Sequence, residues 1–416
     1  MTSLQRILYP IVIKTYKALI HLAALQSDKA KKWVDGRHLW REELQKLVDP
    51  EKKRILIHAA SLGEMEQGTP VLRNLRKQWP DHQIFVSFFS PSGYEYFKET
   101  ELCDAIIYLP LDEKKNSADF AEILKPELAL FIKYEIWPFL LSALKKVNTK
   151  LILAPAVFRA NQIYFKGDQK AFFRKALLKF DRILVQDSPS LEILKKEKIK
   201  GIGLCGDSRF ERALENKAKD YDTTFLKTFI NEKFCLIAGS SWKKEENLLL
   251  NLLEEHSDFK LILAPHDISE GNIQSILQRF SKFGISPYSK KELNSQDRVI
   301  LIDSIGQLRY IYRTADLALI GGGLGKGVHN TIEAIVYQIP VLFGPKRKKF
   351  PETEEMIQLG LAAEIENYPD LKKAFLSFQE QTPASTRFED YIQTKLGASQ
   401  KINEAINELL SNRESI

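Results

Sequence analysis

Short apolar runs alternate with segments of helical period along the first half of the chain. The apolar runs predict strands at residues 54–60, 84–90, 105–109, 128–132, 150–155 and 182–186. Helices are predicted between them at residues 66–78, 91–99, 136–146 and 169–179. Strands that are apolar throughout and separated by helices are typical of a parallel sheet covered by helices on both faces.

The same alternation restarts in the second half. Strands are predicted at residues 234–239, 260–264, 299–302, 317–320, 341–343 and 362–365. Helices are predicted at residues 244–256, 273–283, 305–313, 330–337 and 352–359. The sequence therefore predicts an α/β fold of two tandem, doubly wound, Rossmann-like domains, with an inter-domain cleft at the carboxyl ends of their strands.

The boundaries of these domains follow from polar stretches. A basic linker is expected at residues 29–41, and a polar stretch at 214–232 separates the halves, with the boundary just before this stretch, near Gly206. Residues 388–410 have the spacing of one long amphipathic helix. The predicted divisions are an N-terminal helix at 1–28, a first domain at 29–205, a second domain at 206–387 and a C-terminal helix at 388–416.

The N-terminal segment, residues 4–25, is strongly apolar but is interrupted by basic side chains. Mostly apolar positions at 4, 7, 8, 11, 12, 15, 19 and 22 follow helical spacing, with Arg6, Lys14 and Lys17 between them. The uncharged runs are far shorter than the roughly 20 residues of a membrane span, and no signal-peptide cleavage site is evident. This pattern favours an interfacial helix on an anionic membrane surface. A helix packed on its own domain is the alternative.

Composition and net charge limit which kinds of structural framework and binding partner are expected. Apolar residues make up 44% and charged residues 28% of the 416, as in ordinary globular proteins. The three cysteines are widely spaced without a CxxC pair, which argues against a disulfide framework or a zinc site. A net charge of +7 suits an anionic partner such as a nucleotide, a phospholipid surface or an acidic glycolipid. No aromatic RNA-binding signature is present, so no nucleic-acid partner is expected.

A glycine-dense turn, residues 321–327, follows one of the predicted strands and precedes a predicted helix. Such a turn points backbone N–H groups and a helix N-terminus at an anionic ligand. The Walker A loop does not fit, because Ile320 and Gly327 stand where a glycine and a Ser or Thr belong. The GxGxxG fingerprint does not fit either, because Lys326 stands where its last glycine belongs. The alternative is a tight strand-to-helix turn in which Asn330 caps the helix and Glu333 occupies its third position.

A second polar turn, Ser61-Leu62-Gly63-Glu64, follows the first strand of the first domain. One interpretation is a capping box in which Ser61 and Glu64 satisfy the helix N-terminus. The other places Glu64 at the floor of the cleft as a general base, with Gly63 allowing close approach of a substrate.

Further polar groups follow other predicted strands, and all of them could face the cleft. They are Glu135 with its neighbours at 133–138, Arg209, the pair Ser240-Ser241, and the pair Pro265-His266. Arg209 could hold a phosphate or a carboxylate through its planar fork, or form an inter-domain salt bridge instead.

Taken together, seven motifs in order resemble one enzyme family. They are SLGE at 61–64, EIWP at 135–138, GDSRF at 206–210, IAGSS at 237–241, APH at 264–266, GGGLGKGVHNTIEA at 321–334 and VLFGP at 341–345. In this respect the chain is similar to the 3-deoxy-D-manno-octulosonic acid (Kdo) transferases of lipopolysaccharide synthesis.

The resemblance implies a B-type glycosyltransferase fold and an inverting, metal-independent transfer of Kdo from CMP-Kdo to a lipid A precursor. It also implies association with the cytoplasmic face of the inner membrane. Residues 29–205 would then bind the acceptor, with Glu64 as the general base beside Ser61, Gly63 and Glu135. The second domain would bind the donor through Arg209, Ser240, Ser241, Pro265, His266, Gly322, Gly323, Asn330 and Glu333.

Three segments depart from the family pattern. Lys133-Tyr134-Glu135 stands where Glu-Thr-Glu is usual, residues 264–270 read APHDISE for APRHPER, and residues 329–335 read HNTIEAI for HNPLEPA. Two alternatives therefore stay open. One is another nucleotide-sugar transferase or epimerase on the same fold, and the other is a non-catalytic relative that binds a nucleotide or a glycolipid.

Overall fold

The computed structural model describes residues 3–97, 100–166, 170–294, 296–348 and 350–411, which fold into two compact units. The first unit contains the chain up to Arg212 together with the segment from Lys395 onward, and the second contains Ala213–Thr394. Sequence patterns place the division near Gly206, a few residues before this boundary, and treat the C-terminal segment as separate.

The first unit is built on a parallel sheet of seven strands in the order β3-β2-β1-β4-β5-β6-β7. The strands are β1 (Arg54–Ala59), β2 (Gln83–Phe88), β3 (Ala105–Tyr108), β4 (Leu128–Phe131), β5 (Lys150–Ala156), β6 (Arg182–Val185) and β7 (Ile202–Leu204). The strand order reverses between β1 and β4, which are hydrogen-bonded neighbours. Open parallel sheets bind ligands at the carboxyl ends of the strands where this reversal occurs.

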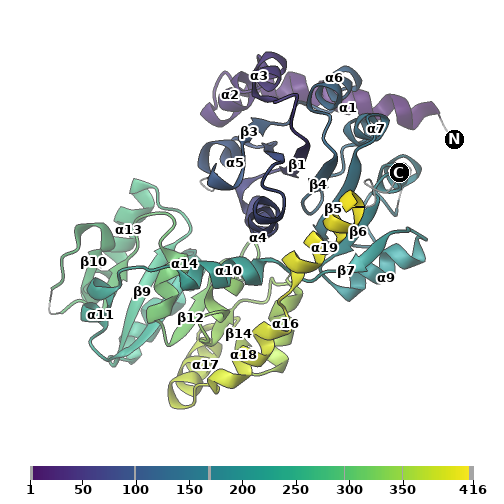
Figure 1. The fold of residues 1–416 in the computed structure, drawn as a ribbon. Helices are drawn as coiled ribbons and strands as arrows, with labels where there is room; N and C mark the ends of the chain where they lie inside the picture. The colour runs from purple at the N-terminus through teal and green to yellow at the C-terminus, as the bar shows by residue number, and fades with distance from the viewer. Residues whose placement is uncertain (1–2, 98–99, 167–169, 295, 349, 412–416) are drawn as a thin grey trace. The chain divides into compact units, whose positions relative to one another are not determined.

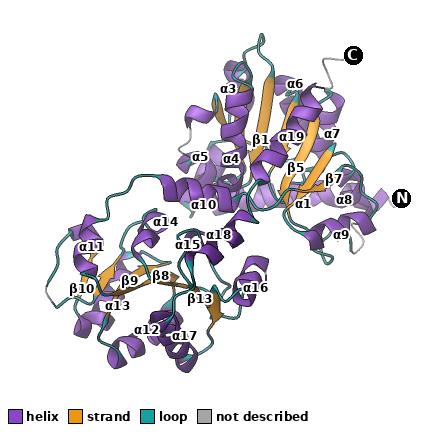
Figure 2. Cartoon of the chain, turned by 60° about the horizontal axis from the view of Figure 1, so that its bottom comes forward, coloured by secondary structure: helices purple, strands orange, loops and turns teal. Residues whose placement is uncertain are grey.

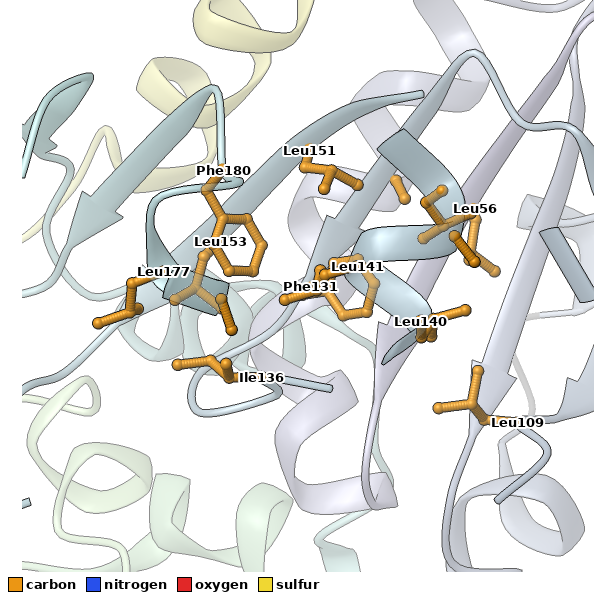
Figure 3. Packing of buried hydrophobic residues seen from close by; sticks show 14 of the residues in the cluster. Leu56, Leu109, Phe131, Ile136, Leu140, Leu141, Leu151, Leu153, Leu177 and Phe180 are labelled. Carbon is orange, nitrogen blue, oxygen red and sulfur yellow. The ribbon is translucent and has the colours of Figure 1, made fainter. Parts of the chain in front are cut away.

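Helices cover both faces of this sheet, as Figure 2 shows in purple against the orange strands. They are α1 (Ser3–Ala23), α2 (Asp28–Asp35), α3 (Trp40–Leu47), α4 (Leu62–Gln78), α5 (Pro91–Tyr96), α6 (Lys114–Leu124), α7 (Pro138–Lys146), α8 (Lys170–Leu177), α9 (Ser188–Lys196) and α19 (Ala398–Ser411). Two apolar cores result. In one, shown in Figure 3, Leu140 and Leu141 of α7 pack over Phe131, with Leu151 and Leu153 beside them.

The second unit repeats the plan with a parallel sheet in the order β10-β11-β9-β8-β12-β13-β14. Its strands are β8 (Phe234–Ser241), β9 (Phe259–Pro265), β10 (Ile285–Pro287), β11 (Val299–Leu301), β12 (Leu317–Ile320), β13 (Val341–Phe343) and β14 (Ala362–Glu364). Its helices are α11 (Thr224–Ile230), α12 (Lys243–Glu255), α13 (Glu270–Phe280), α14 (Leu308–Ile311), α15 (Ile332–Ile335), α16 (Pro351–Gln358), α17 (Tyr368–Glu380) and α18 (Ser385–Gln393). The strand order reverses between β8 and β12. Both units therefore confirm the predicted doubly wound topology.

The C-terminal segment differs from the prediction. The single helix expected at 388–410 is two helices, α18 and α19, because Gly397 adopts φ +92° between them. Ile402 and Ile406 of α19 join the same buried core as Met65 and Leu72 of α4. The apolar stripe of α19 thus returns the chain to the first unit, where Figure 1 shows α19 in yellow beside β5.

Two other polar segments contain helices, and only the first of them was expected to be a linker. The expected linker at 29–41 is mostly helical, since α2 and α3 occupy it. The polar stretch at 214–232 contains the end of α10 (Arg209–Ala218) and all of α11. Each buries only a narrow apolar stripe, which includes Trp33 in α2, Leu44 in α3 and Phe229 in α11, and the polar composition around that stripe resembles that of a loop.

Helix α1 packs one face on the first unit and leaves another exposed. Ile13 is buried with Trp33 and Leu111, and Tyr9, Tyr16 and Ile20 pack against them. The exposed apolar residues are Leu8, Ile11, Val12, Leu19 and Leu22, spaced as one stripe along the helix. The side chains of Leu4, Arg6 and Ile7 lie outside the described ones. Within the described ranges, no helix has the length and apolar character that crossing a membrane requires.

Candidate functional site

The loop after β1 carries Glu64 at the strand-order reversal of the first unit. Glu64 lies in the first turn of α4, and its Oε2 accepts a hydrogen bond from the Ala60 backbone N–H at 2.8 Å. Ser61 is the N-cap residue by backbone conformation, but its hydroxyl accepts no hydrogen bond from the described first turn of α4. The capping-box interpretation is therefore wrong for Ser61, and Glu64 bonds to the residue before the N-cap instead of to the N-cap itself. Gly63 is exposed beside it.

The loop after β4 brings a second carboxylate to the same edge of the sheet. Glu135 is 9% exposed, and its Oε2 lies 3.1 Å from His58 Nε2 and accepts the Trp137 indole N–H at 2.8 Å. His58 is fully buried on β1, and its Nδ1 lies 2.9 Å from the Ser87 hydroxyl on β2. These bonds fix the position of Glu135.

The two carboxylates influence one another. Burial raises the pKa of Glu64, and the negative charge of Glu135 raises it further. The Ala60 N–H and the charges of Lys133 and His58 oppose the rise. A carboxylate with a raised pKa is a stronger proton acceptor, which is the property a general base needs.

Arg209, expected in the donor-binding domain, lies in the first unit at the start of α10. Its guanidinium forms a two-pronged ion pair with Asp207, with Nε–Oδ2 and Nη2–Oδ2 distances of 2.8 and 2.5 Å. Asp207 in turn accepts the Gln186 side-chain amide at 3.4 Å. The salt bridge of Arg209 is thus made within its own unit.

In the second unit, the glycine turn follows β12 and wraps around a buried carboxylate. Glu245 of α12 is 1% exposed, and its Oε1 accepts the backbone N–H groups of Gly322 and Leu324 at 3.0 and 3.2 Å. Its Oε2 accepts the Trp242 N–H at 3.2 Å. Two of the N–H groups that the sequence assigned to an anionic ligand are therefore bonded to the protein itself.

The glycines of this turn are required by close backbone packing. A Cβ on Gly321 would lie 2.1 Å from the Ser240 carbonyl oxygen, and one on Gly323 would lie 2.4 Å from the Gly344 nitrogen. Gly322 has φ +86°. These contacts leave no space for a side chain, so the tight-turn interpretation accounts for the glycine density.

Three aromatic rings gather beside the turn, from the loops after β8, β9 and β12. The centroid of His266 lies 4.6 Å from that of Trp242 and 4.5 Å from that of His329, with the rings nearly parallel. The Trp242 indole N–H donates to His329 Nε2 at 3.1 Å, so neutral His329 carries its proton on Nδ1. Burial, and then the neighbouring His266, lower the pKa of His329.

A lysine completes this group. Lys326 Nζ lies 4.5 Å from the centre of the Trp242 ring, and the Lys326 side chain is exposed. The four residues Trp242, His266, Lys326 and His329 are called the ring cluster below. Stacked rings next to a cation are suited to a ligand that combines a flat base with an anionic group.

Three more of the predicted donor residues, Ser240, Ser241 and Pro265, lie at the ends of β8 and β9. Ser240, with φ +53°, is half-buried at the end of β8, whereas Ser241 is 2% exposed and its hydroxyl donates to Glu246 at 3.3 Å. Pro265 is buried at the end of β9. Ser241 and Pro265 therefore support the loops that carry the ring cluster.

Asn330 precedes a helix that is shorter than expected, and Glu333 lies within that helix. The predicted helix 330–337 is the single turn α15, whose N-cap is Thr331, and the Asn330 side-chain oxygen accepts the Ile332 N–H at 3.1 Å. Asn330 is therefore one residue outside the cap position. Glu333 is half-buried, and its negative charge contributes to the raised pKa of Tyr312 and of Tyr337.

Several residues at these two sheet edges were not identified as site residues from the sequence. They are His58, Trp242, Glu245, Lys326 and His329. Trp242 directly follows Ser240-Ser241, and His329 directly precedes Asn330, so adjacency to predicted residues was the available signal. Glu245 gave no signal, because a sequence does not show which carboxylate of an acidic helix start becomes buried.

The chain is similar to known Kdo transferases. Residues 38–212 match the family model described as 3-deoxy-D-manno-octulosonic-acid transferase (kdotransferase). A 3-deoxy-D-manno-octulosonic acid transferase of Haemophilus influenzae is 29% identical over 321 residues, covering 74% of each chain. The enzyme of that name from Aquifex aeolicus is 29% identical over 328 residues, covering 77% of this chain and 84% of the relative.

Solved structures share the fold at low sequence identity. A UDP-N-acetylglucosamine 2-epimerase (putative) of Listeria monocytogenes has a TM-score of 0.62 at 13% identity and covers 87% of this chain and 97% of its own. A glycosyltransferase of Rickettsia africae has a TM-score of 0.60 at 14% identity and covers 87% of this chain and all of its own. These likenesses confirm the two-domain Rossmann-like fold of B-type glycosyltransferases.

The family match and the curated relatives agree with the resemblance carried by the seven motifs. The chain is a glycosyltransferase, and over most of its length it is similar to the 3-deoxy-D-manno-octulosonic acid (Kdo) transferases.

Proposed function

We propose that this enzyme transfers Kdo from CMP-Kdo to a lipid A precursor with inversion at the anomeric carbon. The observation that carries the proposal is Glu64, a half-buried carboxylate with a raised pKa at the strand-order reversal of the first unit. Similarity to the Kdo transferases indicates the sugar that is transferred, and the geometry of Glu64 indicates the base.

In this mechanism Glu64 accepts the proton of the acceptor hydroxyl while the hydroxyl oxygen attacks the anomeric carbon of Kdo. The bond from that carbon to the CMP phosphate oxygen breaks, and CMP leaves with the electron pair. General base catalysis of this kind contributes about 10²–10⁴ in rate. Glu135 strengthens the base by raising the pKa of Glu64, and His58 and Trp137 hold Glu135 in place.

The donor is proposed to bind the second unit at the ring cluster. Its stacked rings suit the cytosine base, and Lys326 offers a positive charge for the phosphate and for the Kdo carboxylate. Ser240 and Asn330 lie next to the cluster in sequence and are proposed to bind the ribose and the sugar. A cation from the protein would stabilise the departing phosphate, so we propose that no metal cofactor is required.

Helix α1 is proposed to dock on the anionic cytoplasmic face of the inner membrane. Leu8, Val12 and Leu19 on its exposed stripe are 37%, 60% and 60% exposed and would enter the interface. Replacing all three by Ser should release the protein from anionic vesicles while the packed face of α1 stays intact. Unchanged sedimentation with vesicles would contradict this placement.

A transfer assay tests the function. The enzyme is mixed with CMP-Kdo and a tetra-acylated lipid A precursor, and single-turnover product is followed by mass spectrometry. Transfer should persist in EDTA, and CMP but not UDP should inhibit it. Transfer from a UDP-sugar instead, or donor binding without turnover, would favour the alternatives of a different sugar transferase or a non-catalytic relative.

A further inference from the structure

The packed face of α1 contacts the elements that hold the Glu135 loop, residues 133–137. Two separate routes connect α1 to that loop, one through hydrogen bonds and one through aromatic contacts. Every residue on both routes lies in the first unit. Figure 1 shows α1 in purple close to α6 and α7.

The polar route runs through Asp112. This side chain is 2% exposed, and it accepts the Tyr9 hydroxyl of α1 at 2.8 Å. It also accepts the N–H groups of Phe139 and Leu140 in the first turn of α7, at 3.1 and 2.8 Å. One buried carboxylate thus caps α7 and binds α1 at the same time.

The N-terminus of α7 is the end of the Glu135 loop. Trp137 is the N-cap residue of α7, and its indole N–H donates to Glu135. The Tyr9 ring adds a direct contact with α7, since its centroid lies 5.3 Å from that of Phe139. A change in how α1 sits would therefore act on the residue that holds Glu135.

The aromatic route runs through Phe89, just after β2. The Phe89 ring centroid lies 6.1 Å from that of Tyr16 on α1 and 5.0 Å from that of Trp137. Trp33 closes the group, with its centroid 5.7 Å from that of Tyr16 and 5.5 Å from that of Phe89. Trp137 is thus held by Glu135 on one side and by a ring in contact with α1 on the other.

We propose that α1 is a positioning element for the active site, in which Tyr9 and Asp112 set the place of Trp137 and so of Glu135 beside Glu64. The kinetic part of this proposal rests on the proposed function. Tyr9 and Asp112 are remote from the reacting atoms, so they act through α7 and not on the substrate. The helix that binds the membrane would then also order the acceptor-side carboxylates.

The test uses Tyr9→Phe in the full chain, which removes only the hydroxyl. The first readout needs no activity: it is the indole N–H resonance of Trp137 in a ¹H–¹⁵N spectrum, assigned by its loss in Trp137→Phe. Tyr9→Phe should shift this resonance. The second readout is a transfer assay with detergent-dispersed acceptor, in which no membrane is present. There kcat should fall by about tenfold while KM stays unchanged. A change of about tenfold is the size expected for the loss of one hydrogen bond to a charged group.

Two controls separate the proposal from simpler explanations. Tyr96→Phe removes a hydroxyl from a residue that is 61% exposed, and it should change neither readout. Leu19→Ser alters the exposed stripe of α1 and should weaken vesicle binding while leaving the Trp137 resonance in place. If Tyr9→Phe leaves the Trp137 resonance and kcat unchanged, the positioning role is wrong even though transfer continues.

A second variant covers the case in which Tyr9→Phe fails to fold. Phe89→Leu interrupts the aromatic route without touching the buried carboxylate, and it should also shift the Trp137 resonance and lower kcat. If transfer is absent in the wild-type protein, the resonance shifts still decide whether α1 acts on the Glu135 loop. The proposed function and the positioning role can therefore fail separately.

Discussion

In both units the strand order reverses beside the first strand of the sheet, but different kinds of chemical group lie at the two reversals. In the first unit the loops after β1 and β4 present two carboxylates, Glu64 and Glu135, and a buried imidazole holds the second. In the second unit the loop after β12 is folded around the buried Glu245, and imidazole, indole and ammonium groups lie beside it.

This difference teaches that topology fixes where a site forms while the neighbouring side chains decide what it does. Negative charge at one edge suits proton removal, whereas positive and aromatic groups at the other suit an anionic nucleotide. Both edges contain a buried glutamate. Glu135 raises the pKa of the neighbouring Glu64, whereas Glu245 accepts hydrogen bonds from the backbone of the glycine turn. The following predictions test this contrast, from the largest expected effect to the smallest.

The largest effect is expected on the first edge. Glu64→Gln keeps the shape of the side chain but removes the proton acceptor, so turnover should fall by roughly 10² or more while CMP affinity stays unchanged. The measurements are single-turnover rate and CMP titration. Ser61→Ala is the control, and because its hydroxyl does not cap α4 the free energy of unfolding should change by less than about 0.5 kcal/mol. Near-normal turnover in Glu64→Gln would defeat the assignment and point to Glu135.

On the second edge, Glu245→Ala should act on stability. Three backbone N–H groups would lose a buried acceptor, so the free energy of unfolding should fall by about 2–4 kcal/mol, measured by urea denaturation. Glu245→Gln keeps an acceptor oxygen and should recover part of this loss. A Glu245→Ala protein of wild-type stability would show that the turn does not depend on this carboxylate.

A glycine pair separates scaffold from ligand contact in the same turn. Gly323→Ala should destabilise the second unit by about 1–3 kcal/mol, because its Cβ would meet the Gly344 backbone. Gly325→Ala should be nearly neutral, since the nearest atom that its Cβ would meet is the Gly322 oxygen at 3.9 Å. Thermal unfolding and CMP titration of both variants measure the contrast. Equal stability of the two would contradict the packing described for the turn.

The smallest effect is a displacement of a pH profile. The pKa of Glu64 is raised, so Glu64 becomes protonated, and can no longer act as the base, at a pH above the ordinary glutamate range. The acid limb of the kcat/KM profile should therefore lie above that range as well. The sign for stability is opposite: a raised pKa in the folded state favours folding at low pH, and that contribution is lost as pH rises through the folded-state value. Glu135→Gln removes one cause of the rise, so the acid limb should move to lower pH. A limb that stays in place would show that Glu135 has no influence on the base.

The sequence predicted the fold better than it predicted the detailed site. Central strands such as β1 and β12 were found because they are continuous apolar runs, whereas the edge strands β7 and β10 were missed because each has three residues and incomplete burial. Glu64 was identified from its position after β1. The sequence could not show that the Ser61 hydroxyl does not cap α4, or that Glu245 accepts the N–H groups of Gly322 and Leu324, because both depend on contacts made only in three dimensions.

The return of α19 to the first unit also constrains how the chain is made. On the ribosome, residues 213–394 must be synthesised after the first unit's own strands and before α19 emerges, which takes roughly 10–40 seconds at bacterial elongation rates. During that interval the apolar side chains of α4, Met65 and Leu72 among them, lack the partners that α19 later supplies. Nascent chains halted before Ala398 should therefore recruit chaperones more strongly than completed ones, even though the second unit has already been translated.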